Sequence, residues 1–201
     1  MRTTLAWLVS YLLGAIPTGW LLVRATARVD LRTVGSGNIG ATNALRAAGP
    51  WMGLAVLVLD GLKGWLAVGV IAPACLESPD VSARLACGVL AVVGHDFPVG
   101  LKFRGGKGVA TTLGALLGTL PEVAAGALAG WALVTAACRY VSIGSLVFAV
   151  TIPTLQVALG SPPPAVGWGA VLAALIVVRH RSNLQRLRQG TEHRLSFRGR
   201  G

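Results

Sequence analysis

Residues 140–178 read YVSIGSLVFAVTIPTLQVALGSPPPAVGWGAVLAALIVV, a stretch of 39 residues that contains no Asp, Glu, Lys or Arg. A helix needs about 20 apolar residues to cross the hydrocarbon core of a bilayer. The segment from Ser161 to Pro164 divides the stretch, because proline lacks an amide donor and ends a helix. The stretch therefore predicts two membrane-spanning helices joined by a short connection.

The rest of the chain has the same apolar character. Of its 201 residues, 54% are hydrophobic and 12% are charged, about half the charged share of a typical soluble domain. The uncharged run from Leu5 to Val23 has 19 residues, longer than the apolar part of a usual signal peptide. The composition predicts an all-α integral membrane protein, with residues 1–201 forming one polytopic domain.

Apolar runs predict about seven spans, at 4–23, 50–74, 85–100, 108–120, 122–138, 141–160 and 165–178. The run at 108–120 has 13 residues, about 20 Å as a helix, which is less than the thickness of a bilayer core. It either crosses at a tilt or enters and returns. Five full spans therefore remain an alternative to seven.

Lys and Arg are distributed unevenly between the loops. Arg2 precedes the first run, whereas Arg24, Arg28 and Arg32 follow it. Basic residues favour the cytoplasmic side, so we expect the N-terminus outside and the C-terminus in the cytoplasm. With seven spans, the other cations outside the spans, except Arg84, also face the cytoplasm, namely Arg46, Lys102, Arg104, Lys107, Arg139 and all those from Arg179 onward.

The net charge of +11 fits basic cytoplasmic loops that face anionic lipid head groups. The sequence contains no signature of a nucleic-acid-binding fold, so we expect no nucleic-acid partner. Cys75, Cys87 and Cys138 lie in or beside apolar runs without metal-like spacing. They are interpreted as packing residues, with no disulfide framework and no zinc site.

A glycine-rich loop follows the first span, where residues 35–46 read GSGNIGATNALR. Its spacing matches the G-x-G-x-x-G dinucleotide pattern, but no buried strand or βαβ unit surrounds it. Glycine lets backbone amides approach an anion closely, and hydroxyl, amide and guanidinium groups supply further donors. The residues predicted to bind a phosphate-bearing ligand here are Ser36, Gly37, Asn38, Gly40, Thr42, Asn43 and Arg46.

A second loop, residues 94–108, reads GHDFPVGLKFRGGKG. Its cations alternate with glycines, which suits a nest of backbone amides around a phosphate. It is not a Walker A loop, because Gly-Lys is not followed by Ser or Thr. The residues predicted to bind substrate are His95, Arg104, Gly105, Gly106, Lys107 and Gly108, although His95 fits a hydrogen-bonded helix end equally well.

A third polar region follows the last span, where residues 179–192 read RHRSNLQRLRQGTE. His180 and Asn183 are three positions apart and therefore share a helix face. Ser142, on the same predicted side, is expected to line the same site. Asp60 and Lys63 are also three apart, so that they can pair inside the second span. We expect this pair to be structural, with a supporting part in the site as the alternative.

The segments GSGNIGATNALR, GHDFPVGLKFRGGKGVATTLG and HRSNLQRLRQGTE, in this order between apolar runs, resemble the three signatures of a known family. This is the family of bacterial acyl-phosphate:glycerol-3-phosphate acyltransferases of the PlsY type. The resemblance covers essentially the whole chain. Asp96 and Gly100 depart from the pattern, which more usually has an apolar and an aromatic residue there.

The resemblance implies transfer of an acyl group from acyl phosphate to the 1-hydroxyl of glycerol 3-phosphate. The products are lysophosphatidic acid and phosphate, in the first step of bacterial phospholipid synthesis. The resemblance also implies a seven-helix fold in the bacterial inner membrane with a cytoplasmic active site. It suggests no cofactor, and functional coupling to the soluble enzyme that makes acyl phosphate.

This reaction suggests roles for the polar groups. Those expected to hold the acyl phosphate head and the developing oxyanion are Ser36, Asn38, Thr42 and Asn43. Those expected to bind the phosphates are Arg46, Arg104 and Lys107. His180 and Asn183 are expected to orient the attacking hydroxyl, with either His180 or the substrate's own phosphate as the general base.

Glu192 is expected to brace the loops, and residues 193–201 to form a flexible basic tail. No metal is expected, because the protein's own cations can neutralise phosphate. Two other functions remain open on the sequence. A transporter for anionic metabolites would also contain glycine-rich loops between spans, but the chain shows no matching halves. A membrane scaffold would bind anionic lipid through the tail.

Overall fold

The computed structural model describes residues 1–195, and every regular element among them is a helix. Residues 196–201, the end of the predicted basic tail, lie outside the described part. The helices are α1 (Arg2–Ala15), α2 (Thr18–Ala27), α3 (Ala41–Ala48), α4 (Pro50–Leu66), the π-helix η1 (Ala67–Ile71), α5 (Ala72–Cys75), α6 (Val81–Asp96), the 3-10 turn η2 (Val99–Leu101), α7 (Val109–Leu117), α8 (Pro121–Cys138), α9 (Val141–Ala158), α10 (Pro163–Arg179) and α11 (Arg181–Arg188).

Five helical stretches of the described chain are long and apolar enough to cross a membrane, at Arg2–Ala27, Pro50–Cys75, Val81–Leu101, Pro121–Cys138 and Val141–Ala158. A sixth candidate is the pair α10 and α11, which is bent by 51°. Helix α7 has nine residues, about 14 Å, and does not span a bilayer by itself. The prediction of an all-helical membrane protein is confirmed, whereas seven full crossings stay a prediction.

The first span is broken at Ile16 and Pro17, between α1 and α2. The Lys63 ammonium of α4 donates to the Ile16 carbonyl at 2.6 Å and pairs with the Asp60 carboxylate at 2.8 Å. Asp60 also accepts a hydrogen bond from the Thr18 hydroxyl at 2.8 Å. The buried ion pair thus contacts both sides of the break, and its structural role stays a prediction.

Small residues bring α7 close to α4 inside the bundle. A Cβ on Gly64 would lie 1.9 Å from the Thr111 carbonyl oxygen, and one on Gly114 would lie 1.8 Å from the Gly61 carbonyl oxygen. Any larger side chain would push the helices apart. Close backbone approach through small residues is the usual packing device between membrane helices.

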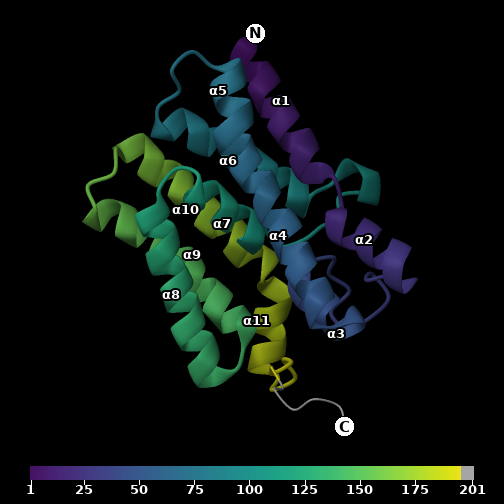
Figure 1. Cartoon of the computed structure of the whole chain (residues 1–201). Helices are drawn as coiled ribbons and strands as arrows, with labels where there is room; N and C mark the ends of the chain where they lie inside the picture. The colour runs from purple at the N-terminus through teal and green to yellow at the C-terminus, as the bar shows by residue number, and fades with distance from the viewer. Residues whose placement is uncertain (196–201) are drawn as a thin grey trace.

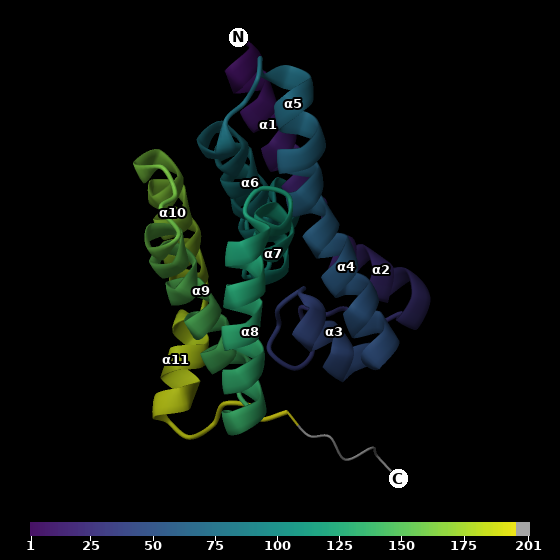
Figure 2. The same ribbon diagram turned by 60° about the vertical axis from the view of Figure 1, so that its left-hand side comes forward.

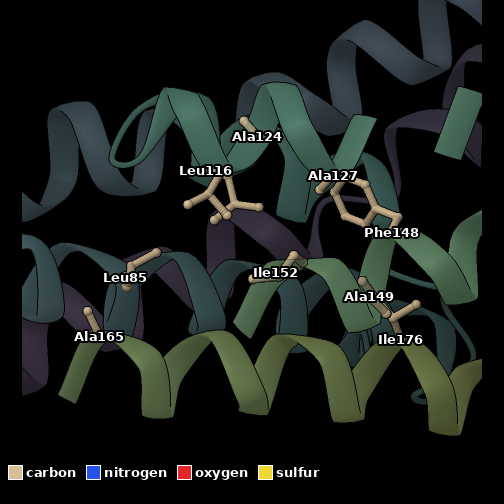
Figure 3. Close-up of a cluster of buried hydrophobic side chains, with 10 residues drawn as sticks. Leu85, Leu116, Ala124, Ala127, Phe148, Ala149, Ile152, Ala165 and Ile176 are labelled. Carbon is tan, nitrogen blue, oxygen red and sulfur yellow. The ribbon is translucent and has the colours of Figure 1, made fainter. Parts of the chain in front are cut away.

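A hydrophobic core joins the C-terminal helices. Leu85, Leu116, Phe148, Ile152 and Ile176 are each at most 1% exposed and pack together, as Figure 3 shows. They come from α6, α7, α9 and α10. This core fixes the positions of α6, α7 and α10, whose ends carry the second and third polar segments.

Helices α3 and α11 lie toward the end of the molecule opposite the N-terminus in both Figure 1 and Figure 2. Helix α3 contains the end of the first glycine-rich loop, and α11 contains the third polar segment. After α11, the Leu195 amide donates to the Arg139 carbonyl at 2.8 Å, and the Arg194 guanidinium donates to the Tyr140 hydroxyl at 2.9 Å. The start of the predicted tail is therefore bonded to the α8–α9 connection.

Candidate active site

The first glycine-rich loop is folded around the Asn43 side chain, which is 2% exposed. Its Nδ2 donates to the carbonyls of Leu31, Val34 and Asn38 at 2.9, 3.1 and 2.8 Å. Its Oδ1 accepts from the Ser36 amide at 3.1 Å. These bonds occupy the Asn43 amide, so Asn43 shapes the loop and leaves ligand contacts to its neighbours.

Glycine is needed beside this residue. Gly35 has φ +56°, in the left-handed region, and a Cβ there would lie 2.3 Å from Asn43 Oδ1. Both the backbone conformation and the close approach exclude a larger side chain. Asn38 then connects the two loops, because its Nδ2 donates to the Gly105 carbonyl at 3.3 Å while its Oδ1 accepts from the Gly40 amide at 2.8 Å.

The second loop packs against the end of α6. The amides of Gly105 and Gly106 donate to the carbonyls of Asp96 and His95 at 3.1 and 2.9 Å. A Cβ on Gly106 would lie 1.8 Å from His95 Nε2, so the imidazole rests directly on the glycine. His95 Nδ1 lies 3.5 Å from the Asp60 carboxylate of α4. Because Asp60 also accepts from Thr18, it connects this loop to the broken first span.

The loop runs into the N-terminus of α7 with unused donors. Within residues 1–195, the backbone amides of Lys107 and Gly108 donate to no protein acceptor. Gly108 has φ +71°, and α7 starts at the next residue. Free amides at a helix start attract anions, and Lys107 adds a full positive charge.

A chain of polar contacts joins this lysine to α11. Lys107 Nζ donates to Asn183 Oδ1, and Asn183 Nδ2 donates to Glu192 at 2.6 Å. Arg186 also pairs with Glu192, at 2.7 Å. Glu192 therefore braces α11 and, through Asn183, holds the Lys107 ammonium in place.

These contacts shift the pKa values of two of the groups. Burial, with a further contribution from the nearby Arg186 charge, lowers the pKa of Lys107 to about 8. Burial alone would raise the pKa of Glu192, but hydrogen bonds from Asn183 and Arg186 outweigh it and keep that pKa below its usual value. Lys107 is thus poised to change charge just above neutral pH.

His180 lies at the bend between α10 and α11 and is 3% exposed. Its Nδ1 lies 2.8 Å from the Ile176 carbonyl oxygen, so a neutral imidazole carries its proton on Nδ1. Nε2 is then the nitrogen with a free electron pair. In this tautomer, Nε2 is the atom that can accept a proton.

A cavity of about 180 Å³ brings the three segments together. Its polar lining consists of Ser36, Asn38, Gly40, Thr42, Asn43, Arg46, Asp60, His95, Lys107, Gly108, Ser142, Ser145, His180, Asn183 and Glu192. Its apolar lining consists of Leu57, Ala41, Val109, Ala110, Leu113, Leu128, Trp131, Val141 and Phe148. One continuous space therefore offers donors for an anion and an apolar surface for a hydrocarbon chain.

Most residues selected from the sequence line this cavity, but some do not. Gly37, Gly105, Gly106 and Lys63 are not among its lining residues. Arg104 is exposed and also lies outside the lining. Lys107, only three positions along, is the cation of this loop that lines the cavity.

The sequence interpretation missed the apolar half of the cavity and one cation beside it. Trp131 and Phe148 come from mostly apolar helices, where no pattern marks one apolar residue as lining a site. Arg179 donates to the carbonyls of Gly106 and Gly105 at 2.9 and 3.0 Å. Its position directly before His180, on the same side as the second loop, was the available signal.

Comparison with known proteins identifies the family of this chain. The family model described as glycerol-3-phosphate acyltransferase matches residues 4–190. A glycerol-3-phosphate acyltransferase of Geobacter sulfurreducens is 45% identical over 186 residues, 92% of this chain and 94% of that protein. One from Rhodospirillum rubrum is 45% identical over 194 residues, covering 94% of this chain and 88% of the relative.

Two solved structures share the fold. The glycerol 3-phosphate form of PlsY (YgiH), an integral membrane glycerol 3-phosphate acyltransferase, gives a TM-score of 0.91 at 36% identity, covering 98% of this chain and 96% of that one. The lysophosphatidic acid form gives 0.88 at 34% identity with the same coverage. The family match and the structural likeness agree over nearly the whole sequence. This chain belongs to the glycerol-3-phosphate acyltransferase family.

Proposed function

We propose that the cavity between the two glycine-rich loops and α11 is the active site of this glycerol-3-phosphate acyltransferase. There the enzyme transfers an acyl group from acyl phosphate to the 1-hydroxyl of glycerol 3-phosphate, leaving lysophosphatidic acid and phosphate. The observation that carries the proposal is the joined polar and apolar lining of one cavity. Membership in an enzyme family counts against the transporter and scaffold alternatives.

Glycerol 3-phosphate is placed at the second loop and α11. Lys107 supplies a held ammonium, and the unused amides of Lys107 and Gly108 supply further donors to phosphate. The Arg46 side chain lines the same cavity and can bind phosphate in a forked geometry. Arg104 is left out of this role, because its exposed side chain lies away from the cavity.

The acyl phosphate head is placed at the first loop. The hydroxyls of Ser36 and Thr42 line the cavity and are available as donors to the phosphate or to the oxyanion. Asn38 and Asn43 have a different part, because their amides are used to hold the loop. They position the backbone from which Ser36 projects.

The 1-hydroxyl oxygen attacks the acyl carbonyl carbon, and the bond from that carbon to the phosphate oxygen breaks as phosphate leaves. His180 Nε2 accepts the hydroxyl proton in the first version of this step, and a substrate phosphate accepts it in the second. The Nδ1 contact to Ile176 favours His180, since it leaves Nε2 unprotonated in the neutral ring. Acyl phosphate is already activated, so positioning and charge stabilisation can supply most of the catalysis.

The acyl chain is placed in the apolar half of the cavity, among Leu113, Trp131 and Phe148. Leu57 of α4 and Leu128 of α8 line the same cavity and are 42% and 41% exposed. Residues that face both a cavity and the outer surface mark an opening. A lipid-like donor can therefore enter sideways from the bilayer between α4 and α8.

Localisation and partners complete the proposal. We place the protein in the bacterial inner membrane with the N-terminus outside and the active site facing the cytoplasm. The distribution of Lys and Arg supports this orientation. The donor would come from the soluble enzyme that makes acyl phosphate.

The first experiment is an assay of purified protein in detergent or lipid with palmitoyl phosphate and glycerol 3-phosphate. Release of phosphate and formation of lysophosphatidic acid are both followed. We expect turnover by the native protein and its loss in Ser36→Ala and His180→Ala. Folded protein that turns over palmitoyl-CoA but not palmitoyl phosphate would refute the proposed donor. Full activity of Ser36→Ala would remove the first loop from the site.

A further inference from the structure

Arg179 makes a set of contacts that the proposed reaction does not use. Its Nε donates to the Gly106 carbonyl at 2.9 Å, and its Nη2 donates to the Gly105 carbonyl at 3.0 Å. The guanidinium carbon lies 5.0 Å from the centroid of the Phe97 ring. The Arg179 guanidinium thus binds two successive backbone carbonyls while it stacks on the Phe97 ring. We call this set of contacts the Arg179 clamp.

These contacts complete the hydrogen bonding of the two glycines. Their amides are bonded to the end of α6, and their carbonyls are bonded to Arg179. Gly106 is therefore fixed from both sides. Directly after these two glycines, the Lys107 amide has no protein acceptor among the described residues.

We infer that Arg179 is a positioning residue that sets the second loop for the phosphate of the acceptor substrate. This inference rests on the proposed placement of glycerol 3-phosphate. By fixing the Gly105 and Gly106 carbonyls, Arg179 fixes the direction of the peptide plane that carries the Lys107 amide. Arg179 itself acts through the loop and does not line the cavity.

The Arg179 clamp also links the second glycine-rich loop to His180, the candidate base. Arg179 is the last residue of α10, and His180 follows it immediately. A shift of the helix end therefore moves the loop carbonyls and the imidazole together. The distance between the acceptor phosphate site and the base is kept by one rigid unit, which suits a substrate whose phosphate and reacting hydroxyl lie on the same small molecule.

Replacing arginine by lysine keeps the charge and removes the fork. A single ammonium cannot hold two carbonyls in one plane, nor stack in the same way on Phe97. For Arg179→Lys we expect the KM for glycerol 3-phosphate to rise about tenfold, since charge-assisted hydrogen bonds of this kind are the strong ones. The KM for palmitoyl phosphate should change by less than about twofold, because the substitution weakens only the binding of glycerol 3-phosphate.

The matched control is Arg181→Lys, two positions along and exposed. It repeats the same chemical change at the same helix junction, and its kinetic constants should stay at the native values. Phe97→Leu provides a milder test, since it keeps apolar volume and removes the aromatic face. It should raise the KM for glycerol 3-phosphate in the same direction by about threefold.

The experiment measures both KM values and kcat for these variants, together with glycerol 3-phosphate binding to donor-free protein by calorimetry. Equal rises in both KM values, or a loss of kcat alone, would overturn the positioning role. If Arg179→Lys does not fold, an unchanged KM in Phe97→Leu would overturn it. A native protein that binds glycerol 3-phosphate but does not use acyl phosphate contradicts the proposed function. In that case, weaker binding of glycerol 3-phosphate to Arg179→Lys than to the native protein still tests the positioning role of Arg179.

Discussion

The Lys107 ammonium donates a hydrogen bond to Asn183, joining the second glycine-rich loop to α11 across 76 positions of the sequence. Asn183 is held in turn by Glu192, which is paired with Arg186. A flexible lysine is thereby fixed at the start of α7 before any ligand arrives. Such preorganisation lowers the ordering cost of binding a phosphate.

The lowered pKa of Lys107 predicts a pH dependence. The ammonium is charged below about pH 8 and becomes neutral above it, so phosphate binding should weaken as the pH rises. We expect kcat/KM for glycerol 3-phosphate to fall by up to about tenfold per pH unit above this value. Lys107→Arg should remove the fall up to about pH 9.5, because a guanidinium keeps its charge there. The same decline in both proteins would assign the titration to another group.

Arg46 and Arg104 form a natural matched pair. Both were selected from the sequence as phosphate ligands, but only Arg46 lines the cavity. We expect Arg46→Lys to raise KM or lower kcat by about tenfold, since a single ammonium cannot replace a forked contact. Arg104→Lys should change neither constant by more than about twofold. Initial rates with each substrate varied in turn decide this, and near-native activity of Arg46→Lys would remove that residue from the site.

The sequence was sufficient for the parts of the protein that are governed by composition and local chemistry. A long uncharged run in a bilayer must bond its own backbone groups, which a helix does, so most span positions were predictable. The break at Pro17 was not predicted, because the apolar run continues through it. The break depends on two residues of α4: Lys63 donates to the Ile16 carbonyl, and Asp60 accepts from the Thr18 hydroxyl.

The site was harder to predict in detail, because a polar side chain can either hold a loop in shape or line the cavity. Asn43 is buried and holds the first loop, whereas Ser36 lines the cavity, although both looked like ligand donors. Arg104 and Lys107 flank the same glycines, and only the turn of the backbone decides which one reaches the cavity. Long-range contacts such as that of Arg179 with the second loop leave no local pattern.

Metal removal gives a simple test of how phosphate charge is neutralised. Lys107, Arg46 and the free amides at the start of α7 already offer positive character to a substrate phosphate in the cavity. Treatment with EDTA is therefore expected to leave the rate of lysophosphatidic acid formation unchanged. Addition of Mg²⁺ to the treated enzyme serves as the control. Strong inhibition that Mg²⁺ reverses would show that a metal ion takes part.

The proposed acyl site can be tested at its opening. Leu128 lines the cavity and is 41% exposed, so a larger side chain there can be tolerated without disturbing the core. Leu128→Trp should narrow the entrance and lower kcat/KM for palmitoyl phosphate by about tenfold, with a smaller effect on octanoyl phosphate, because a longer chain buries more apolar surface in the narrowed space.

Leu133→Trp is the matched control for this change. It lies on the same helix, is 71% exposed and does not line the cavity, so it should leave the ratio between the two donors unchanged. Thermal unfolding of both variants in detergent separates a local obstruction from loss of fold. An equal decrease for long and short donors in Leu128→Trp would show that the chain does not pass this residue. The acyl group would then have to enter elsewhere than between α4 and α8.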